Sequence, residues 1–424
     1  MKNMNGKSIV HIFQRTLNLL EPRLTDHGRR VAYILRCMLE YEGSYNKKQL
    51  DRYLLVSLLH DIGAYKTDEI DQMLTFDCGN VWSHSIYGYL YLRYLSPLKD
   101  EAAILLYHHL DYNKFGNIEY ENRHIAMYLN IADRVDILLC QSSGLKNLQF
   151  LEKYRDIRFS GEGIDLLYLA DKKYHILDSL NDDSYKEQLE YWSSSLYLKE
   201  EDCKDCLRLI AYSIDFHNEK SLLRIVITSI IAYHIALLLQ FDDEEKKLLS
   251  YAALVYDIGM LSIPHEIISA PRKLDDSERE LMRTHVTTME NLLHGNMDES
   301  VIRIAGGHHE KLDGSGYPRH LKGPQIDKLQ RTLAIADIIS ALSCGNNRRI
   351  AYDRKEIINT VTNEALTGKL DIHIVKIVTQ NLDRIMEDSI PICDEILKNY
   401  RAIKEQFDTI NAKFEKFNQR NEME

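Results

Sequence analysis

The sequence contains little of what β-rich folds need. Of 424 residues, only 19 are glycine and 7 are proline. β-sandwiches and β-barrels use many such turn residues between short strands. No convincing run of alternating polar and apolar residues occurs, and apolar residues recur instead at helical spacing, as at Leu50, Leu54 and Leu58. The sequence therefore predicts an all-α fold.

An excess of positive charge is also absent. The chain has 53 Lys and Arg residues against 64 Asp and Glu residues, a formal net charge of −11. This balance argues against a basic surface for duplex nucleic acid. A small anionic ligand would need local positive charge from metal ions or from a few Lys and Arg side chains.

Long apolar runs and paired cysteines are missing as well. The most apolar run, 225–239, is shorter than the roughly 20 residues that span a bilayer, so we expect no membrane partner. The cysteine count is odd, at seven, and Met1–Asn5 lead into no apolar signal core. We therefore expect a cytoplasmic protein with reduced thiols. Cys203 and Cys206 form a lone C-x-x-C in a helical stretch, which is a weak zinc or redox signal.

Four short elements occur twice in the same order. The first half contains LLHDIGAYK, a histidine, YHHLDY and NIADRVD, and the second half contains LVYDIGMLSIP, a histidine, GHHEKLDGSGYP and AIADIISAL. Their spacings agree in outline: His84 to His108 is 24 positions, and His285 to His308 is 23. A repeat of this length indicates a domain duplication. We expect domains at 1–196 and 197–380, followed by a helical segment at 381–424.

The last segment carries a heptad pattern. Its apolar residues are spaced 4, 3, 4, 3, 4 and 3 positions apart, with charged residues between them: Ile396, Tyr400, Ile403, Phe407, Ile410, Phe414 and Phe417. Two interpretations remain open. The segment is either a long helix packed on its own domain or a coiled coil that forms a homodimer.

The first half contains a set of residues suited to two metal ions. An imidazole binds one side of an ion, whereas a carboxylate has two oxygens and can bridge two ions. The mixture of nitrogen and oxygen ligands suits iron, manganese, zinc or nickel. The candidate ligands are His27, His60, Asp61, His84, His108, His109 and Asp133.

This arrangement resembles the HD superfamily of metal-dependent phosphohydrolases, over about residues 20–140 and 210–350. The second-half segment HHEKLDGSGYP is similar to the motif of the HD-GYP subfamily of cyclic-dinucleotide phosphodiesterases. The resemblance implies a helical bundle that holds two, sometimes three, metal ions. It implies hydrolysis of cyclic di-GMP or a cGAMP-like dinucleotide by a water activated between the ions.

Carried over to the first half, the resemblance implies that all seven candidates are ligands and that Asp61 is the bridging, catalytic one. Arg23 replaces the family glutamate that recruits a third ion, so we expect two ions, with iron or manganese favoured and nickel or zinc as alternatives. Ala64 replaces the family lysine. Lys66, two positions further on, is a candidate phosphate contact.

In the second half the motifs are divided differently. The substrate-loop signature is present at Asp313, Gly314, Gly316, Tyr317 and Pro318. The HD histidine is replaced by Tyr256, the family lysine by Met260 and the upstream histidine by Ser221, while His217 lies out of register. The residues left could hold a single ion, or they form a vestigial site: Asp257, His285, His308, His309 and Asp337.

The motifs favour a phosphodiesterase with its chemistry in the first half and a regulatory or supportive second half. The first alternative is a cyclic-dinucleotide receptor with weak catalysis. The second is an HD phosphohydrolase of linear dinucleotides or nucleotides. A third is a diiron oxygenase, because some HD domains of that class have nearly the same ligands.

Overall fold

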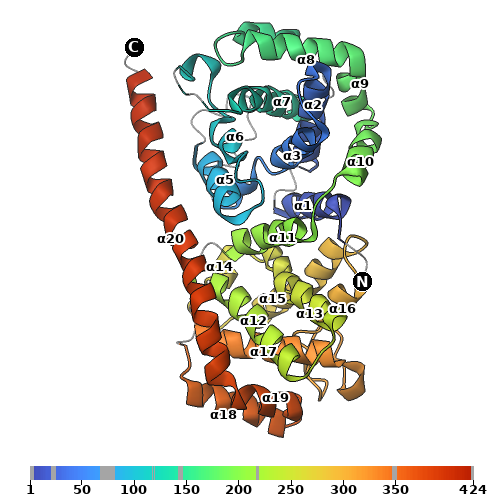
Figure 1. The fold of residues 1–424 in the computed structure, drawn as a ribbon, viewed down its shortest axis with the longest axis vertical. Helices are drawn as coiled ribbons and strands as arrows, with labels where there is room; N and C mark the ends of the chain where they lie inside the picture. The colour runs from blue at the N-terminus through green and yellow to red at the C-terminus, as the bar shows by residue number, and fades with distance from the viewer. Residues whose placement is uncertain are drawn as a thin grey trace. The chain divides into compact units, whose positions relative to one another are not determined.

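The structure is a computed structural model, and it describes residues 4–20, 25–66, 82–116, 118, 120–141, 147–215, 219–345 and 351–421. Within these ranges the chain forms helices joined by turns and loops, with only two isolated β-bridges and no strand. The predicted all-α fold is confirmed (Figure 1). No helix in the described part of the chain is long and apolar enough to cross a membrane.

The chain divides into two compact units. The first unit comprises residues 5–209 and 402–424, and the second comprises residues 1–4 and 210–401. The change at 209/210 falls inside helix α11 (Glu200–Asp215). The division at 1–196, 197–380 and 381–424 stays a prediction.

The first unit is built around helix α2, which packs against α3, α7 and α8. Helix α5 packs against the short 3₁₀ helix η2 and against α6. The elements of this unit before α11 are α1 (Gly6–Leu20), α2 (His27–Glu42), α3 (Lys47–Leu58), η2 (Ile62–Lys66), α5 (Trp82–Leu95), α6 (Ala102–Tyr107), η3 (Tyr112–Lys114), α7 (Arg123–Gln141), η4 (Gln149–Tyr154), α8 (Gly161–Tyr174), α9 (Ile176–Asn181) and α10 (Tyr185–Ser195).

The second unit is built around helix α12, which packs against α13 and α17, while α15 packs against η5. Its elements are α12 (Glu219–Leu238), α13 (Asp243–Val255), η5 (Ile258–Ser262), α14 (His265–Ile268), α15 (Asp276–Leu293), α16 (Glu299–Ala305), η6 (Gly323–Gln325), α17 (Lys328–Cys344), α18 (Arg354–Leu366), α19 (Ile372–Gln380) and the first part of α20 (Leu382–Asn421).

The same order of elements therefore occurs in both units. Helices α2, α3, α5, α6 and α7 of the first unit correspond in order to α12, α13, α15, α16 and α17 of the second, with η2 corresponding to η5. Each repeated motif falls at the same place in both series. The duplication seen in the sequence is thus a duplication of helical topology.

Side-chain caps fix where several of these helices begin. Asn46 and Gln49 form a capping box at α3, and Asp242 and Glu245 form the equivalent box at α13. In each box the first side chain accepts from a backbone N–H that has no partner within the helix, and the second side chain accepts from the N–H of the first residue. The start of the helix before each HD-type motif is therefore set by local sequence.

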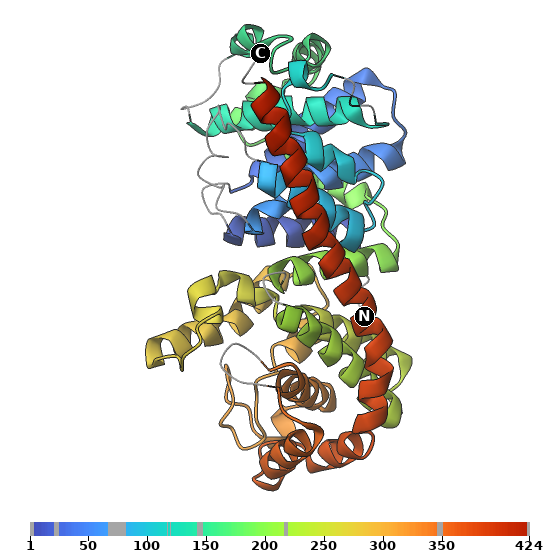
Figure 2. The ribbon, with the colours of Figure 1, turned by 90° about the vertical axis from the view of Figure 1, so that its left-hand side faces the viewer.

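Helix α20 contains the predicted heptad segment. Its residues from 402 onward belong to the first unit, where the Phe407 ring stacks on Tyr87 at 4.2 Å and the Phe414 ring on Trp82 at 4.5 Å between centroids. Figure 2 shows the end of this helix running along α5. Part of the apolar stripe is therefore covered within the chain, and a homodimer through this helix stays a prediction.

Candidate metal centre

The HD pair of the first unit lies directly after α3, and two local features set its orientation. His60 Nδ1 donates to the carbonyl oxygen of Ser57 at 2.8 Å, so the Nε2 atom is left to face the neighbouring carboxylates. Gly63 allows η2 to approach α5 closely, because a Cβ atom here would overlap the carbonyl oxygen of His84 and the amide nitrogen of Gly88. The glycine thereby brings His84 beside Asp61.

The predicted ligands form two groups, and within each group the candidate ligand atoms lie within 4.8 Å of one another. One group is His27, His60 and Asp133, and the other is Asp61, His84, His108 and His109. They come from α2, the turn after α3, α5, the turn after α6, and α7. The structure therefore brings together all seven residues that the sequence singled out.

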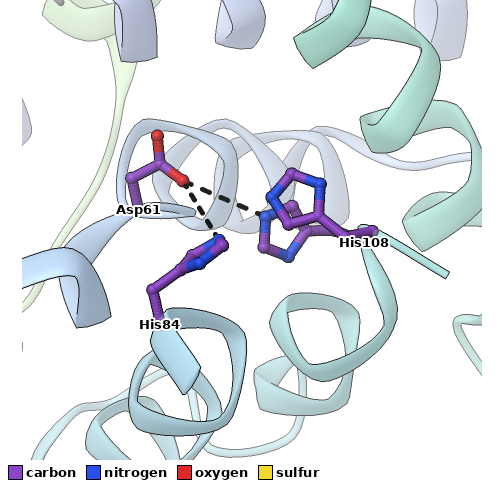
Figure 3. A group of neighbouring side chains, drawn as sticks. Asp61, His84 and His108 are labelled. Atoms are coloured by element: carbon purple, nitrogen blue, oxygen red, sulfur yellow. Dashed lines mark ion pairs between the residues drawn. The ribbon is translucent and has the colours of Figure 1, made fainter. Parts of the chain in front are cut away.

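Asp61 lies between the two groups. Its Oδ2 atom is 3.5 Å from His27 Nε2 and 3.3 Å from His60 Nε2. Its Oδ1 atom is 3.7 Å from His84 Nε2 and 4.0 Å from His108 Nε2. Dashed lines mark these two ion pairs in Figure 3. The two oxygens of one carboxylate thus point to different sets of imidazoles, as a bridging ligand requires.

The buried polar atoms of the site fit a pair of cations. Among the residues that the structure describes, Asp61 Oδ1, Asp133 Oδ1, His108 Nε2 and both ring nitrogens of His109 are buried without a hydrogen-bond partner. Buried polar atoms without partners are costly and uncommon in folded proteins. Here they face one another, so a cation between them would satisfy several at once.

The protonation states also suit metal binding. Burial, with the neighbouring His84 and His60, lowers the pKa of His108 to about 3, and burial lowers that of His109 well below its usual value. Burial would raise the pKa of Asp61, but His60, His27 and His84 hold it well below the ordinary range. Neutral imidazoles and an ionised carboxylate are the forms that bind metals.

His27 differs from the other histidines. Burial would lower its pKa, but the neighbouring carboxylates of Asp133 and Asp136 raise it to about 10. A protonated His27 supplies positive charge beside these carboxylates. A metal ion that bound there would have to displace this proton.

Three contributors to the site were missed by sequence reasoning. Asp136 Oδ2 lies 2.7 Å from His27 Nδ1 and 3.1 Å from Arg30 Nη2, so it orients the imidazole. Buried Arg134 donates to Asp133 Oδ2 at 2.6 Å. The available signal was spacing, because Asp136 lies three residues after Asp133 and so shares its face of α7.

Several residues named from the sequence lie outside the described part of the structure. They are Arg23, His217 and the side chains of Lys66, Ser221 and Phe417. The expectation that Lys66 contacts phosphate therefore stays a prediction.

The second unit brings together His285, His308 and His309, whose ligand atoms lie within 4.8 Å of one another. Asp257 Oδ1 lies 3.5 Å from His285 Nε2 and 3.7 Å from His308 Nε2. Asp337 instead accepts hydrogen bonds from Arg224. The five residues predicted for a single ion are therefore divided between a histidine group and an ion pair.

The loop with the GYP signature folds over His309. The Tyr317 ring lies 4.6 Å from the His309 ring between centroids, and Tyr317 N donates to the His309 carbonyl oxygen at 3.2 Å. Buried Glu310 accepts from the backbone N–H of Arg319 at 2.7 Å and of Leu321 at 2.9 Å. The loop is thus built onto the histidine pair, while the exposed Asp313 caps its tip by accepting from Ser315 N at 2.9 Å.

Two family models of the HD domain match the chain, one at residues 24–138 and the other at residues 206–374. The chain is 28% identical over 416 residues to 3′3′-cGAMP-specific phosphodiesterase 1 of Vibrio cholerae, covering 92% of this chain and 94% of that protein. It is 32% identical over 146 residues to the cyclic di-GMP phosphodiesterase response regulator RpfG of Xanthomonas campestris, covering 34% of this chain and 39% of that protein.

A solved structure shares the fold. The crystal structure of the cyclic GMP-AMP specific phosphodiesterase V-cGAP3 of V. cholerae superposes with a TM-score of 0.57 at 17% sequence identity. The match covers 90% of this chain and 98% of that chain. At this identity the likeness is one of fold.

Together with the helical fold and the His and Asp site, these matches show that the chain belongs to the HD superfamily of metal-dependent phosphohydrolases. The two HD domains occur in tandem, and the second carries the GYP loop signature at residues 313–318. The predicted family and the predicted enzyme class, a metal-dependent phosphodiesterase, are confirmed.

Proposed function

We propose that the chain hydrolyses a cyclic dinucleotide, cyclic di-GMP or a cGAMP-like molecule, at a binuclear metal site in its first unit. The observation that carries this proposal is the placement of Asp61, whose two oxygens face two separate histidine groups. In the second unit Asp257 faces histidines through one oxygen and Arg224 through the other, and Tyr256 stands where His60 does.

The residues of the first unit would divide the work as follows. His27, His60 and Asp133 would hold one ion, His84, His108 and His109 the other, and Asp61 both. Two ions of this kind activate the attacking water and stabilise the charge that develops in an in-line displacement at phosphorus. The family resemblance favours iron or manganese, and nickel or zinc stay alternatives because imidazole and carboxylate ligands suit all four.

The chain's own groups would prepare the site for this chemistry. Asp136 fixes the ring of His27, the carbonyl of Ser57 fixes that of His60, and the carbonyl of Leu105 accepts from His108 Nδ1 at 2.6 Å. Each of these contacts leaves Nε2 directed to the centre. Such preorganisation means that little rearrangement is needed when charge develops in the transition state.

The relatives support the class of substrate. One relative, which the match covers over 94% of its length, is named for action on 3′3′-cGAMP. Another, which the match covers over 39% of its length, is named for action on cyclic di-GMP. A chain with net charge −11 would also need cations to hold an anionic dinucleotide. We propose that the second unit regulates or supports the first, and that the protein works in the cytoplasm.

A direct test is to incubate the metal-reconstituted full-length protein with a panel of cyclic and linear dinucleotides and to identify the products by mass. We expect a linear dinucleotide or nucleotide product from a cyclic substrate. Binding without any product would make the protein a receptor. Cleavage of linear substrates alone would assign it to the other HD phosphohydrolases.

The variant Asp61→Asn tests the location of the chemistry. It removes the carboxylate that faces both groups, and we expect turnover to fall by about 100-fold or more, the scale of losing a group that stabilises transition-state charge. The matched variant is Asp257→Asn, the same change in the second unit. If turnover falls as far in Asp257→Asn as in Asp61→Asn, the placement in the first unit is wrong.

A further inference from the structure

The guanidinium of Arg224 lies between two carboxylates of the second unit. Its Nη2 atom donates to Asp337 Oδ1 at 2.7 Å and lies 3.2 Å from Asp257 Oδ2, while its Nε donates to Asp337 Oδ1 at 3.1 Å. The guanidinium carbon lies 6.0 Å from the centre of the Tyr256 ring. A fixed positive charge thus lies where two acidic groups converge.

The same two carboxylates have a different neighbour in the first unit. Asp61 and Asp133 correspond to Asp257 and Asp337 in the duplicated order of elements. Their Oδ2 and Oδ1 atoms lie 3.5 Å and 3.3 Å from His27 Nε2, in the group of candidate metal ligands. In the second unit the equivalent oxygens, Asp257 Oδ2 and Asp337 Oδ1, face the arginine instead.

The register of the two repeats explains this exchange. Arg224 stands three residues after Ser221, as Arg30 stands three residues after His27. In the first unit Arg30 pairs with Asp136. The position of Asp136, three residues after the α7 aspartate, is taken in α17 by Ser340, whose hydroxyl lies 2.6 Å from Thr228 Oγ1.

Without that carboxylate, the arginine of the second unit has no partner at position 340. A partly buried charge gains from a counter-charge, and the guanidinium pairs with the two aspartates that are within reach.

Tyr256 completes the change. Its side chain is fully buried, and its hydroxyl lies 3.2 Å from Thr228 Oγ1. A phenol keeps its proton at neutral pH, because its ordinary pKa is about 10. A protonated phenol is a poor replacement for the imidazole of His60.

We propose that the guanidinium of Arg224 takes the place of one metal ion in the second unit. It supplies the positive charge that Asp257 and Asp337 need, and it keeps a cation away from their facing oxygens. Arginine does not lose its charge in proteins, so this replacement is permanent. The group of His285, His308 and His309 could then accept one ion at most, and the two residue sets do not fit a binuclear pair.

The consequence is a chemical difference between the duplicated sites. A guanidinium can donate hydrogen bonds to a phosphate, but it does not provide the second ion of a two-metal hydrolytic site. The GYP loop of this unit would therefore face a site that can hold an anion but not hydrolyse it by the two-ion route. This inference concerns only the second unit, so it does not depend on the function proposed for the first.

The test measures metal content and thermal stability in the full-length protein. Wild type, Arg224→Ala and Arg224→Lys are loaded with Mn²⁺, desalted, and analysed for metal per chain and for Tm with and without Mn²⁺. We expect Arg224→Ala to hold about one equivalent more than wild type and to gain more in Tm from Mn²⁺, because its two aspartates now need a cation. Arg224→Lys keeps a positive charge and should behave as wild type.

A second pair of variants keeps the proposal testable if Arg224→Ala fails to fold. Tyr256→His restores the family histidine, yet it should add no metal while Arg224 is present. Tyr256→His combined with Arg224→Gln, which keeps a long polar side chain without its charge, should add about one equivalent. A gain of metal in Tyr256→His alone would overturn the proposal, as would an Arg224→Ala protein that folds with unchanged metal content and unchanged response to Mn²⁺.

The matched control is Arg30→Ala in the first unit. Arg30 supports Asp136, which in turn orients His27, so its loss should weaken Mn²⁺ binding, by about 10-fold or more. Weaker Mn²⁺ binding in Arg30→Ala and a gain of metal in Arg224→Ala would together show that Arg224 acts as a cation in the metal's place. If Arg30→Ala gained metal as Arg224→Ala does, the gain would not be specific to the second unit and the proposal would fail.

Discussion

The two units share an order of helices but differ in what lies between their central carboxylates. In the first unit the imidazole of His27 lies between Asp61 and Asp133, whereas in the second unit the guanidinium of Arg224 lies between Asp257 and Asp337. The helices that carry these groups follow one another in the same order in both units. The same order of helices can therefore support two different sites, because a few side chains decide whether the central aspartates meet an imidazole or a permanently charged guanidinium.

The glycine of the HD motif offers the strongest test of this comparison. Gly63 and Gly259 are both crowded, since a Cβ atom would overlap the backbone of His84 in one case and of His285 in the other. Overpacking of this kind costs about 1–3 kcal/mol of the free energy of unfolding. We expect both alanine variants to lose stability, and only Gly63→Ala to lose turnover and metal affinity, because it moves α5 and His84.

Thermal unfolding, metal content and product formation measure these effects together. The comparison would fail if Gly259→Ala lost as much turnover as Gly63→Ala at equal stability. That result would indicate that both units contribute directly to hydrolysis.

The residue that supports His27 gives a smaller effect. Asp136→Asn keeps the shape of the side chain but weakens the contact that orients the imidazole, and such changes cost about 10–100-fold in metal affinity. Ser340→Ala, the change at the equivalent position of the second unit, should leave total metal content as it is. Titration with Mn²⁺ checks both variants. Equal Mn²⁺ affinity in wild type and Asp136→Asn would show that Asp136 does not support metal binding.

The smallest effect concerns the end of α20. Phe414 stacks on Trp82, and Phe414→Leu would lose an aromatic contact worth about 0.5–1.5 kcal/mol. We expect faster hydrogen exchange in α5 and unchanged exchange in α15, since residues from 402 onward belong to the first unit. Faster exchange in α15 alone would contradict the assignment of this segment.

A coiled-coil dimer, one of the two interpretations left open, and the packing of α20 on its own chain have the same sequence pattern. An apolar stripe at heptad spacing reports that one face of a helix is buried, but not what buries it. In the structure Phe407 and Phe414 lie on aromatic residues of α5, more than 300 positions earlier in the chain. Contacts over such separations are decided by tertiary packing.

The fold class, the duplication and the candidate ligands could be predicted from short segments of the sequence. Scarce glycine and proline with helical periodicity predicted the all-α fold, and the repeated motifs predicted the duplication. The His and Asp motifs predicted which side chains converge in the first unit. These features could be read because a metal site needs particular donor types, and because the residues that donate them occur in a repeated order.

The tertiary structure decided the rest. It shows that Asp61 lies between two histidine groups, that Asp136 and Arg30 support His27, and that Arg224 pairs with Asp257 and Asp337. Sequence spacing placed Arg30 and Arg224 in the same register. Their partners differ because the position of Asp136 in the first unit is occupied by Ser340 in the second. The sequence determined which groups are available, and the packing of helices distant in sequence determined which charge each one meets.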